Sequence, residues 1–275
     1  MTSTSEEAFF KRDGDGAYLP QPHSRGPWNP NSLHGRVVIG LAGYELERVH
    51  GGAEWMPARL TVDMYRLPDF SPIAAKTAVV RGGRRIKLVD VELIQDGKSV
   101  ARGTAQFLIR GENAPGKTIS PPKWDAPLPD ELPPPPSNQF GGRMWKMRNV
   151  ADWFGSNDMK RGAWMAEIRE VVEGSPLTPF QRVAMAADFV SPLANRSDNS
   201  LGYINTDVTV YLHRLPVGEW IGFEKINHHA TDGVAIGECF LHDVEGPIGS
   251  ASCAALRQAR EAPFGTPQQI EAVKG

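Results

Sequence analysis

The sequence of 275 residues predicts an α+β protein in which one chain carries two copies of the same structural unit. Three observations predict this class. A segment recurs along the chain, period-two hydrophobic patterns follow helical stretches, and a proline-rich segment separates the two copies. The length is enough for two domains of about 100–150 residues each. We therefore expect a duplicated domain rather than a single large one.

The repeat is clearest in two nine-residue segments, Leu60 to Pro68 (LTVDMYRLP) and Val208 to Pro216 (VTVYLHRLP). They share Thr, Val, Arg, Leu and Pro at an offset of 148 residues, and the same offset carries Val100 onto Ile248. Internal self-similarity at a fixed spacing indicates repeated structural units.

Each copy begins with a helical segment and continues with strands. The helices are expected over Gly35 to Arg48 and Thr178 to Phe189. Alternating apolar and polar residues around Leu60 and Val208 are typical of half-buried strands. Further strands are expected over Lys87 to Ile94, Val100 to Ile109, Gly233 to His242 and Ile248 to Leu256, with turns at Gln95-Asp96-Gly97 and Glu245-Gly246-Pro247. A helix followed by a hairpin-linked sheet is an α+β unit, and the sheet can bury the helix on its concave face.

The segment from Glu112 to Phe140 contains nine prolines, so neither a helix nor a central strand is expected to run through it. Its Pro133–Pro136 run predicts extended polyproline II, as an interdomain strap or as a ligand for a proline-recognising domain. We predict an N-terminal unit over residues 25–111, a linker over 112–140 and a C-terminal unit over 141–260. Residues before Arg25 and from Arg260 onward are expected to be loosely ordered.

Composition narrows the classes of function. Thirty basic and 32 acidic residues give no excess positive charge, so a nucleic-acid partner is not expected. Two cysteines do not make a disulfide-stapled secreted domain. The first residues lack a signal-peptide pattern, and no stretch approaches the roughly 18 apolar residues of a membrane span. A cytoplasmic protein without a membrane partner is expected.

Two local patterns suggest ligand sites. Arg84 and Arg85 follow a pair of glycines, and arginine forks suit phosphate groups, although a basic turn is also a common solvated loop.

The pair His228-His229, with Asp232 and His242, raises the question of a metal. Their spacing matches no metal motif, and neighbouring strand residues point to opposite faces, so we predict no metal site.

The pattern as a whole resembles the double hot-dog acyl-CoA thioesterases, the thioesterase II type and its actinobacterial relatives, in which each sheet wraps a central helix. The resemblance covers about Arg25 to Arg257. It rests on the Leu33-His34-Gly35-Arg36-Val37-Val38 helix entry, the helix carrying Asp188, and the Tyr211-Leu212-His213-Arg214 strand. It implies a tandem hot-dog fold, two helix-wrapping antiparallel sheets joined edge to edge, with the proline-rich linker between them.

The resemblance also implies a reaction and its residues. An Asp, a Ser or Thr and a Gln hold a water that attacks the thioester carbonyl, and helix-start N–H groups polarise that carbonyl. These positions fall on Asp188, on Asn205 with Thr206 beside it, and on Cys253, where a thiol replaces the amide. His34 and Gly35 stand at the first helix start, where His34 caps the helix or contacts substrate. Arg84 and Arg85 are candidates for the phosphates of coenzyme A.

The expected activity is hydrolysis of an acyl-CoA substrate to an acid and coenzyme A, with no cofactor. A non-catalytic acyl-CoA or lipid-binding protein is the first alternative, because Cys253 has lost the amide. An enoyl-CoA hydratase is the second, although Leu193 stands where such an enzyme needs His. Cys253 is expected to fill the core rather than act as a nucleophile. Homo-oligomers through the sheets remain open.

Overall fold

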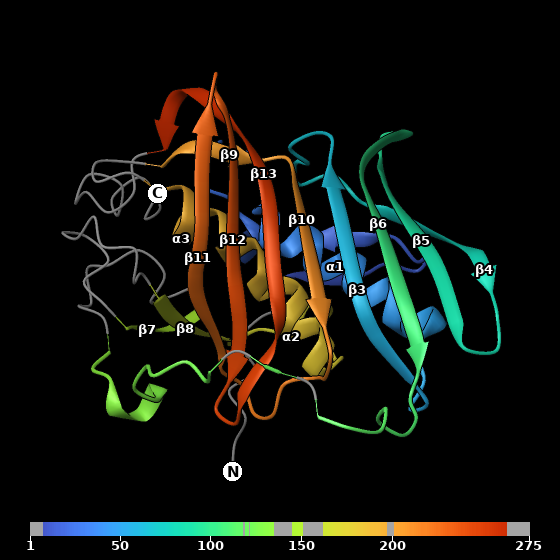
Figure 1. The fold of residues 1–275 in the computed structure, drawn as a ribbon. Helices are drawn as coiled ribbons and strands as arrows, with labels where there is room; N and C mark the ends of the chain where they lie inside the picture. Colours follow the sequence, from blue (N-terminus) through green and yellow to red (C-terminus); the bar gives the residue numbers. More distant parts are fainter. Residues whose placement is uncertain are drawn as a thin grey trace, which may run out of the picture.

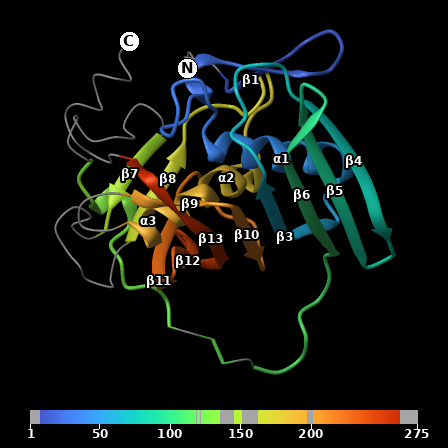
Figure 2. The same cartoon turned by 90° about the horizontal axis from the view of Figure 1, so that it is seen from above.

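The fold is described here from a computed structural model, which covers residues 8–117, 119–120, 122–134, 145–150, 162–196 and 201–262. Within these residues, eleven antiparallel strands form one continuous sheet that curves around the helices (Figures 1 and 2). The sheet order is β4-β5-β6-β3-β10-β13-β12-β11-β8-β7, and β9 pairs with β13. The predicted α+β class is confirmed.

The strands of the first half are β3 (Trp55–Met64), β4 (Ala74–Gly82), β5 (Ile86–Gln95) and β6 (Lys98–Ile109). Those of the second half are β7 (Trp145–Asn149), β8 (Gly162–Glu167), β9 (Leu201–Asn205), β10 (Asp207–Leu212), β11 (Ile221–Thr231), β12 (Val234–Asp243) and β13 (Gly246–Ala262). The predicted strands are all present, each extended or shifted by a few residues at its ends.

The two repeated segments pair with each other at the centre of the sheet. Strand β10 runs antiparallel to β3, with Thr209 opposite Thr61, and the two hydroxyl oxygens lie 3.1 Å apart. On either side, β6 corresponds to β13, β5 to β12 and β4 to β11, so the halves are related by an approximate two-fold axis through this pair. The expected edge-to-edge joining of two sheets is therefore present.

Two helical segments fill the concave side of the sheet (Figure 2). Helix α1 (Gly35–His50) is predicted almost to its last residue. The second segment is broken, since α2 (Pro179–Ala186) passes through a 3-10 turn, η3 (Ala187–Phe189), into α3 (Val190–Asn195). Pro192 explains the break, because it has no N–H to give the carbonyl of Asp188, four residues earlier. The distortion places Asp188 at the turn.

The helices pack closely where α1 has glycines. A Cβ on Gly43 would lie 2.8 Å from the Cβ of Ala184, and a Cβ on Gly40 would lie 2.5 Å from Cγ of Met185. Such short distances mean that a larger residue at either position would push the helices apart. The close packing brings the start of α1 against the end of α2.

The described part of the N-terminal segment is ordered, contrary to expectation. Strands β1 (Phe10–Arg12) and β2 (Tyr18–Pro20) pair, and a 3-10 turn, η1 (Pro22–Ser24), follows. Phe9 and Phe10 are fully buried, and their N–H groups donate to the carbonyls of Glu170 and Val171 at 3.0 and 2.9 Å. Two adjacent apolar aromatic residues anchor the segment against the second half of the chain.

The described part of the linker runs along one end of the strands (Figure 1) and contains one 3-10 turn, η2 (Pro129–Glu131). Trp124 fixes it, with its ring 4.9 Å from His242 and 5.4 Å from Trp164. Pro135 and Pro136 lie outside the described residues, so the predicted polyproline II run stays a prediction. No helix in the described ranges is long and apolar enough to span a bilayer.

Candidate active site

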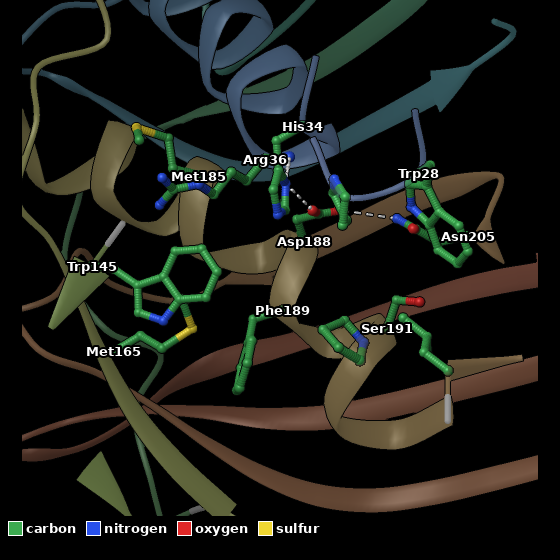
Figure 3. Close-up of a pocket in the computed structure, with 13 residues that line it drawn as sticks. Trp28, His34, Arg36, Trp145, Met165, Met185, Asp188, Phe189, Ser191 and Asn205 are labelled. Atoms are coloured by element: carbon green, nitrogen blue, oxygen red, sulfur yellow. Dashed lines mark hydrogen bonds and ion pairs between the residues drawn. The ribbon is translucent and has the colours of Figure 1, made fainter. Parts of the chain in front are cut away.

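Asp188 is the centre of the candidate site (Figure 3). It is 7% exposed, and its Oδ1 accepts a hydrogen bond from Nδ2 of Asn205 at 2.9 Å. Its Oδ2 lies 3.2 Å from Nδ1 of His34. The broken helix of the second half, the β9–β10 strand end and the start of α1 therefore meet at one carboxylate.

The start of α1 is shaped to receive this carboxylate. A Cβ on Gly35 would lie only 2.9 Å from Oδ1 of Asp188, so the close approach requires glycine. The first turn of a helix also carries N–H groups without helical acceptors and a partial positive charge, which favour an anion. Gly35 therefore leaves room for the carboxylate beside the helix start, where Asn205 and His34 hold it.

His34 has two partners for one nitrogen. Its Nδ1 accepts from the backbone N–H of Arg36 at 3.2 Å, which caps the helix. The same Nδ1 faces Asp188, and it donates to a carboxylate only when it carries a proton. His34 therefore links the start of α1 to the Asp188 carboxylate.

The surroundings keep Asp188 ionised. Burial alone would raise the pKa of this carboxyl. Hydrogen bonds from His34 and Asn205, with the positive charge of Arg36, outweigh burial and hold its pKa below the usual value. A carboxylate that stays ionised can accept a hydrogen bond from a water molecule and orient it.

Two cavities flank Asp188. The inner cavity, about 40 Å³, is mostly apolar; it is lined by Pro27, Trp28, His34, Arg36, Trp145, Met165, Met185, Asp188, Phe189, Ser191, Pro192, Leu201 and Asn205. The outer cavity, about 290 Å³, is more polar and includes Tyr65, Arg66, Leu67, Thr206 and Gln258. Because His34, Asp188 and Asn205 line both, a ligand could reach across the carboxylate from one to the other.

A buried ion pair supports the inner cavity. Nη1 of Arg36 donates to both carboxylate oxygens of Glu167, at 2.8 and 2.7 Å, and both side chains are almost fully buried. The guanidinium carbon of Arg36 also lies 4.4 Å from the ring centre of Trp145 and 4.8 Å from that of Phe9. These contacts fix a cation close to Asp188, which a sequence pattern cannot reveal because Glu167 is 131 residues away.

The structure brings together four of the predicted site residues: His34, Gly35, Asp188 and Asn205. Thr206 also lines the outer cavity, but it is exposed and its hydroxyl donates to the carbonyl of Ala254 at 3.2 Å. Cys253 is buried and lines neither cavity. Burial raises the pKa of its thiol to about 12, and its sulfur accepts from Nδ2 of Asn195 at 3.6 Å.

Arg84 and Arg85 lie far from this site. They occupy the β4–β5 hairpin, beside a cavity lined by Arg81, Gly83 and Ile86. Ile86, next to the hairpin, pairs with Leu108 of β6, which in turn pairs with Met56 of β3. The hairpin is therefore at the Met56 end of β3, whereas the site is at the Met64 end. Eight residues of strand separate the two levels, about 26 Å at 3.3 Å per residue. The structure does not bring these arginines to the site.

Two of the three histidines considered for a metal have other partners. Nδ1 of His228 lies 3.0 Å from Oδ1 of Asn195, and Nε2 of His242 lies 3.0 Å from Oε2 of Glu224. Asp232 occupies a hairpin turn with a positive φ of 51°. Across the described ranges, no group of three or more His, Cys, Asp or Glu side chains is arranged to hold a metal ion.

The fold and this site define a class of protein: a double hot-dog chain in which an acid of one half lies against the helix start of the other. Two family models match the sequence, the acyl-CoA thioesterase N-terminal domain over residues 24–108 and the acyl-CoA thioesterase C-terminal domain over residues 119–254. The chain belongs to the acyl-CoA thioesterase family.

Solved structures support the fold. A candidate thioesterase II from Thermobifida fusca is 16% identical with a TM-score of 0.74, over 94% of this chain and 99% of that one. A hot-dog protein of unknown function from Alicyclobacillus acidocaldarius is 16% identical with a TM-score of 0.71, over 89% and 92%. A candidate thioesterase from Novosphingobium aromaticivorans is 19% identical with a TM-score of 0.67, over 91% and 99%. Among curated proteins none matches. At these identities the likeness concerns the fold, and it confirms the tandem hot-dog prediction.

Proposed function

We propose that this chain hydrolyses acyl-CoA thioesters to a carboxylic acid and coenzyme A. The observation that carries the proposal is the placement of Asp188: ionised, held by Asn205 and His34, set against a helix start, and flanked by an apolar and a polar cavity. The family of the chain supports the same reaction.

In the proposed mechanism Asp188 orients a water beside the thioester carbonyl and takes one of its protons as the water oxygen attacks. Asn205 holds the carboxylate in place, and N–H groups in the first turn of α1 stabilise the developing oxyanion. The C–S bond then breaks, and the proton passes to the leaving thiolate. The thiol of Cys253 stays protonated and takes no part.

The two cavities suggest how the substrate lies. The apolar inner cavity would take the acyl group, and the polar outer cavity would take the pantetheine arm. Arg66, exposed at the outer cavity, is better placed than Arg84 or Arg85 to meet the phosphates. One water-sized group needs about 10–15 Å³, so the inner cavity of about 40 Å³ has room for about three such groups. We therefore propose that short acyl groups are preferred over long ones.

One observation favours a second function, binding without turnover. The position implied for an amide carries Cys253, whose side chain does not reach either cavity. Such a chain would bind acyl-CoA at the same site and release no thiol.

Thiol release from a panel of acyl-CoAs, acetyl to palmitoyl, separates the two functions when thermal stabilisation by each ligand is measured alongside. Release that is fastest for the short acyl-CoAs supports the proposal. Stabilisation without release would contradict hydrolysis and favour a binding protein. Release that rises steadily toward palmitoyl-CoA would contradict the proposed placement of the acyl group.

A further inference from the structure

Ser191 carries a buried hydroxyl without a conventional partner. The residue is 1% exposed, and among the described residues its Oγ has no nitrogen or oxygen hydrogen-bond partner; the partner it has is the thiol of Cys253. Serine inside a helix commonly bonds back to a carbonyl one turn earlier, and this hydroxyl does not. A buried polar group that stays unpaired weakens the fold, so its presence needs another reason.

The position of Ser191 suggests that reason. It follows Asp188 by three residues and therefore lies on the same side of the helical segment. It lines the inner cavity together with Asp188 and Asn205, and it is the only hydroxyl-bearing residue among those that line this cavity (Figure 3). A ligand that fills this cavity would therefore lie against both Asp188 and Ser191.

Cys253, which lines neither cavity, lies within hydrogen-bonding reach of Ser191. Burial raises the pKa of the Cys253 thiol, and hydrogen bonds from the amide of Asn195 and the hydroxyl of Ser191 oppose this only in part. A protonated thiol is a weak donor and a weak acceptor, so it leaves Ser191 largely unpaired. The strand position that the resemblance assigns to an amide therefore supplies no polar group to the cavity, whereas the helix does.

We propose that Ser191 Oγ, with Asp188 and Asn205, holds the attacking water, in the place left by the missing amide on β13. This inference rests on the proposed hydrolysis. The hydroxyl accepts one hydrogen of the water or donates to its oxygen, while the other hydrogen points to Asp188. The water oxygen is then aimed at the carbonyl of an acyl group lying in the inner cavity.

The test is Ser191→Ala, measured for steady-state kinetics on the best acyl-CoA and for thermal stability. The expected result is a fall in kcat of about tenfold or more with KM nearly unchanged, because a water-holding contact is lost. The melting temperature should stay the same or rise, because the variant removes an unpaired buried hydroxyl. Ser252→Ala, a half-buried serine of β13 that lines neither cavity, is the matched control and should leave both values unchanged.

A second variant keeps the test informative. Cys253→Gln added to Ser191→Ala restores an amide on β13, and partial recovery of kcat is expected. An unchanged kcat in Ser191→Ala would overturn the role of Ser191 and leave the proposed hydrolysis standing. A parallel loss of kcat and melting temperature would also overturn it, in favour of a packing role. No thiol release by the unaltered protein would overturn the proposed hydrolysis, and this inference with it.

Discussion

At the start of each of the helices α1 and α2, an acidic side chain from the other half of the chain lies against the first turn, but the two acids have different surroundings. At the start of α1, an acid of the second half, Asp188, lies against the first turn beside Gly35. At the start of α2, an acid of the first half, Glu47, lies against the first turn beside Thr178. The approximate two-fold axis of the sheet relates the two helix starts, but the acids occupy different positions of the repeat, since the offset of 148 carries Glu47 onto Asn195.

The two carboxylates differ in the hydrogen-bond donors and the free space around them. Oε2 of Glu47 accepts from the hydroxyl of Thr178 at 2.6 Å and from Nε2 of Gln181 at 2.9 Å. Thr178 in turn caps α2 by accepting from the N–H of Gln181 at 3.1 Å. Asp188 has a glycine and two cavities beside it instead, and neither cavity reaches Glu47. The start of α2 at Glu47 is a structural contact without room for a ligand, and we call it the closed site. The start of α1 at Asp188 has room for a ligand, and we call it the open site.

The pKa values of the two acids are also shifted in opposite directions. Burial raises the pKa of Glu47, and its two hydrogen bonds only partly oppose that effect. The partners of Asp188 more than offset burial and lower its pKa. Duplication therefore supplies two related helix starts, and the residues around each acid decide which helix start is open to a ligand.

Gly35→Val should break the open site most strongly. The added side chain would overlap the Asp188 carboxylate, and a misplacement of about 1 Å can lower the rate of an enzyme about 100-fold. We expect about this loss in kcat/KM for the best acyl-CoA, with a folded protein by circular dichroism. Wild-type turnover would show that the carboxylate does not act from this position.

Asn205→Ala should lower kcat about tenfold, because Asp188 loses the hydrogen bond that orients Oδ1. Asn205→Thr keeps a polar group that can donate to the carboxylate, and it should retain more activity than the alanine variant. Equal rates for the two variants would indicate that the side chain at this position does not orient Asp188.

Met185→Ala should widen the inner cavity, since Met185 lines it and packs over Gly40. The acyl panel should then show its best rate at a longer chain than in the wild type. The substitution should also destabilise the fold by about 2–5 kcal/mol, as core Met→Ala changes do. An unchanged chain-length profile would place the acyl group elsewhere.

Glu47→Ala should break the closed site and affect stability only. Thr178 and Gln181 would lose their shared acceptor, at a cost of about 1–2 kcal/mol in the free energy of unfolding. Glu47→Gln keeps an oxygen acceptor and removes the buried charge, so its stability near pH 7 should equal or exceed the wild type. Chemical denaturation of both variants measures these differences.

The pH dependence of stability should have opposite signs at the two acids. The pKa of Glu47 is raised above 4.5 in the fold, so its contribution is full below that value and is lost as pH rises through the raised pKa. The pKa of Asp188 is lowered below 3.8, so its contribution is full above that value and is lost as pH falls. Melting curves of Glu47→Gln and Asp188→Asn against wild type from pH 3 to pH 8 check both signs, and parallel curves at every pH would contradict them.

The sequence predicts much of the fold because the repeat and the strand periodicity are local signals. It misses strands without alternation, such as β8, where all six residues are buried, and the mostly exposed edge strand β4. It also misses the order of the N-terminal segment, since only the tertiary contacts of Phe9 and Phe10 reveal it.

The candidate site is predicted in part for a similar reason. The helix entry at His34 and Gly35 and the motif around Asp188 are short-range patterns, and the register of β10 locates Asn205. Arg84 and Arg85 form an equally local pattern, but only the strand pairing shows that they lie at the opposite end of the sheet. The unpaired hydroxyl of Ser191 is visible only once the packing around it is known.

The most direct test of the central claim is thiol release by Asp188→Asn beside Glu47→Gln, the same acid-to-amide type of change at the two related helix starts. The open-site variant should lose at least about 100-fold in kcat on short acyl-CoAs, and the closed-site variant should keep wild-type turnover. Equal activity in the two variants, whether both retained or both lost, would contradict the assignment of hydrolysis to Asp188.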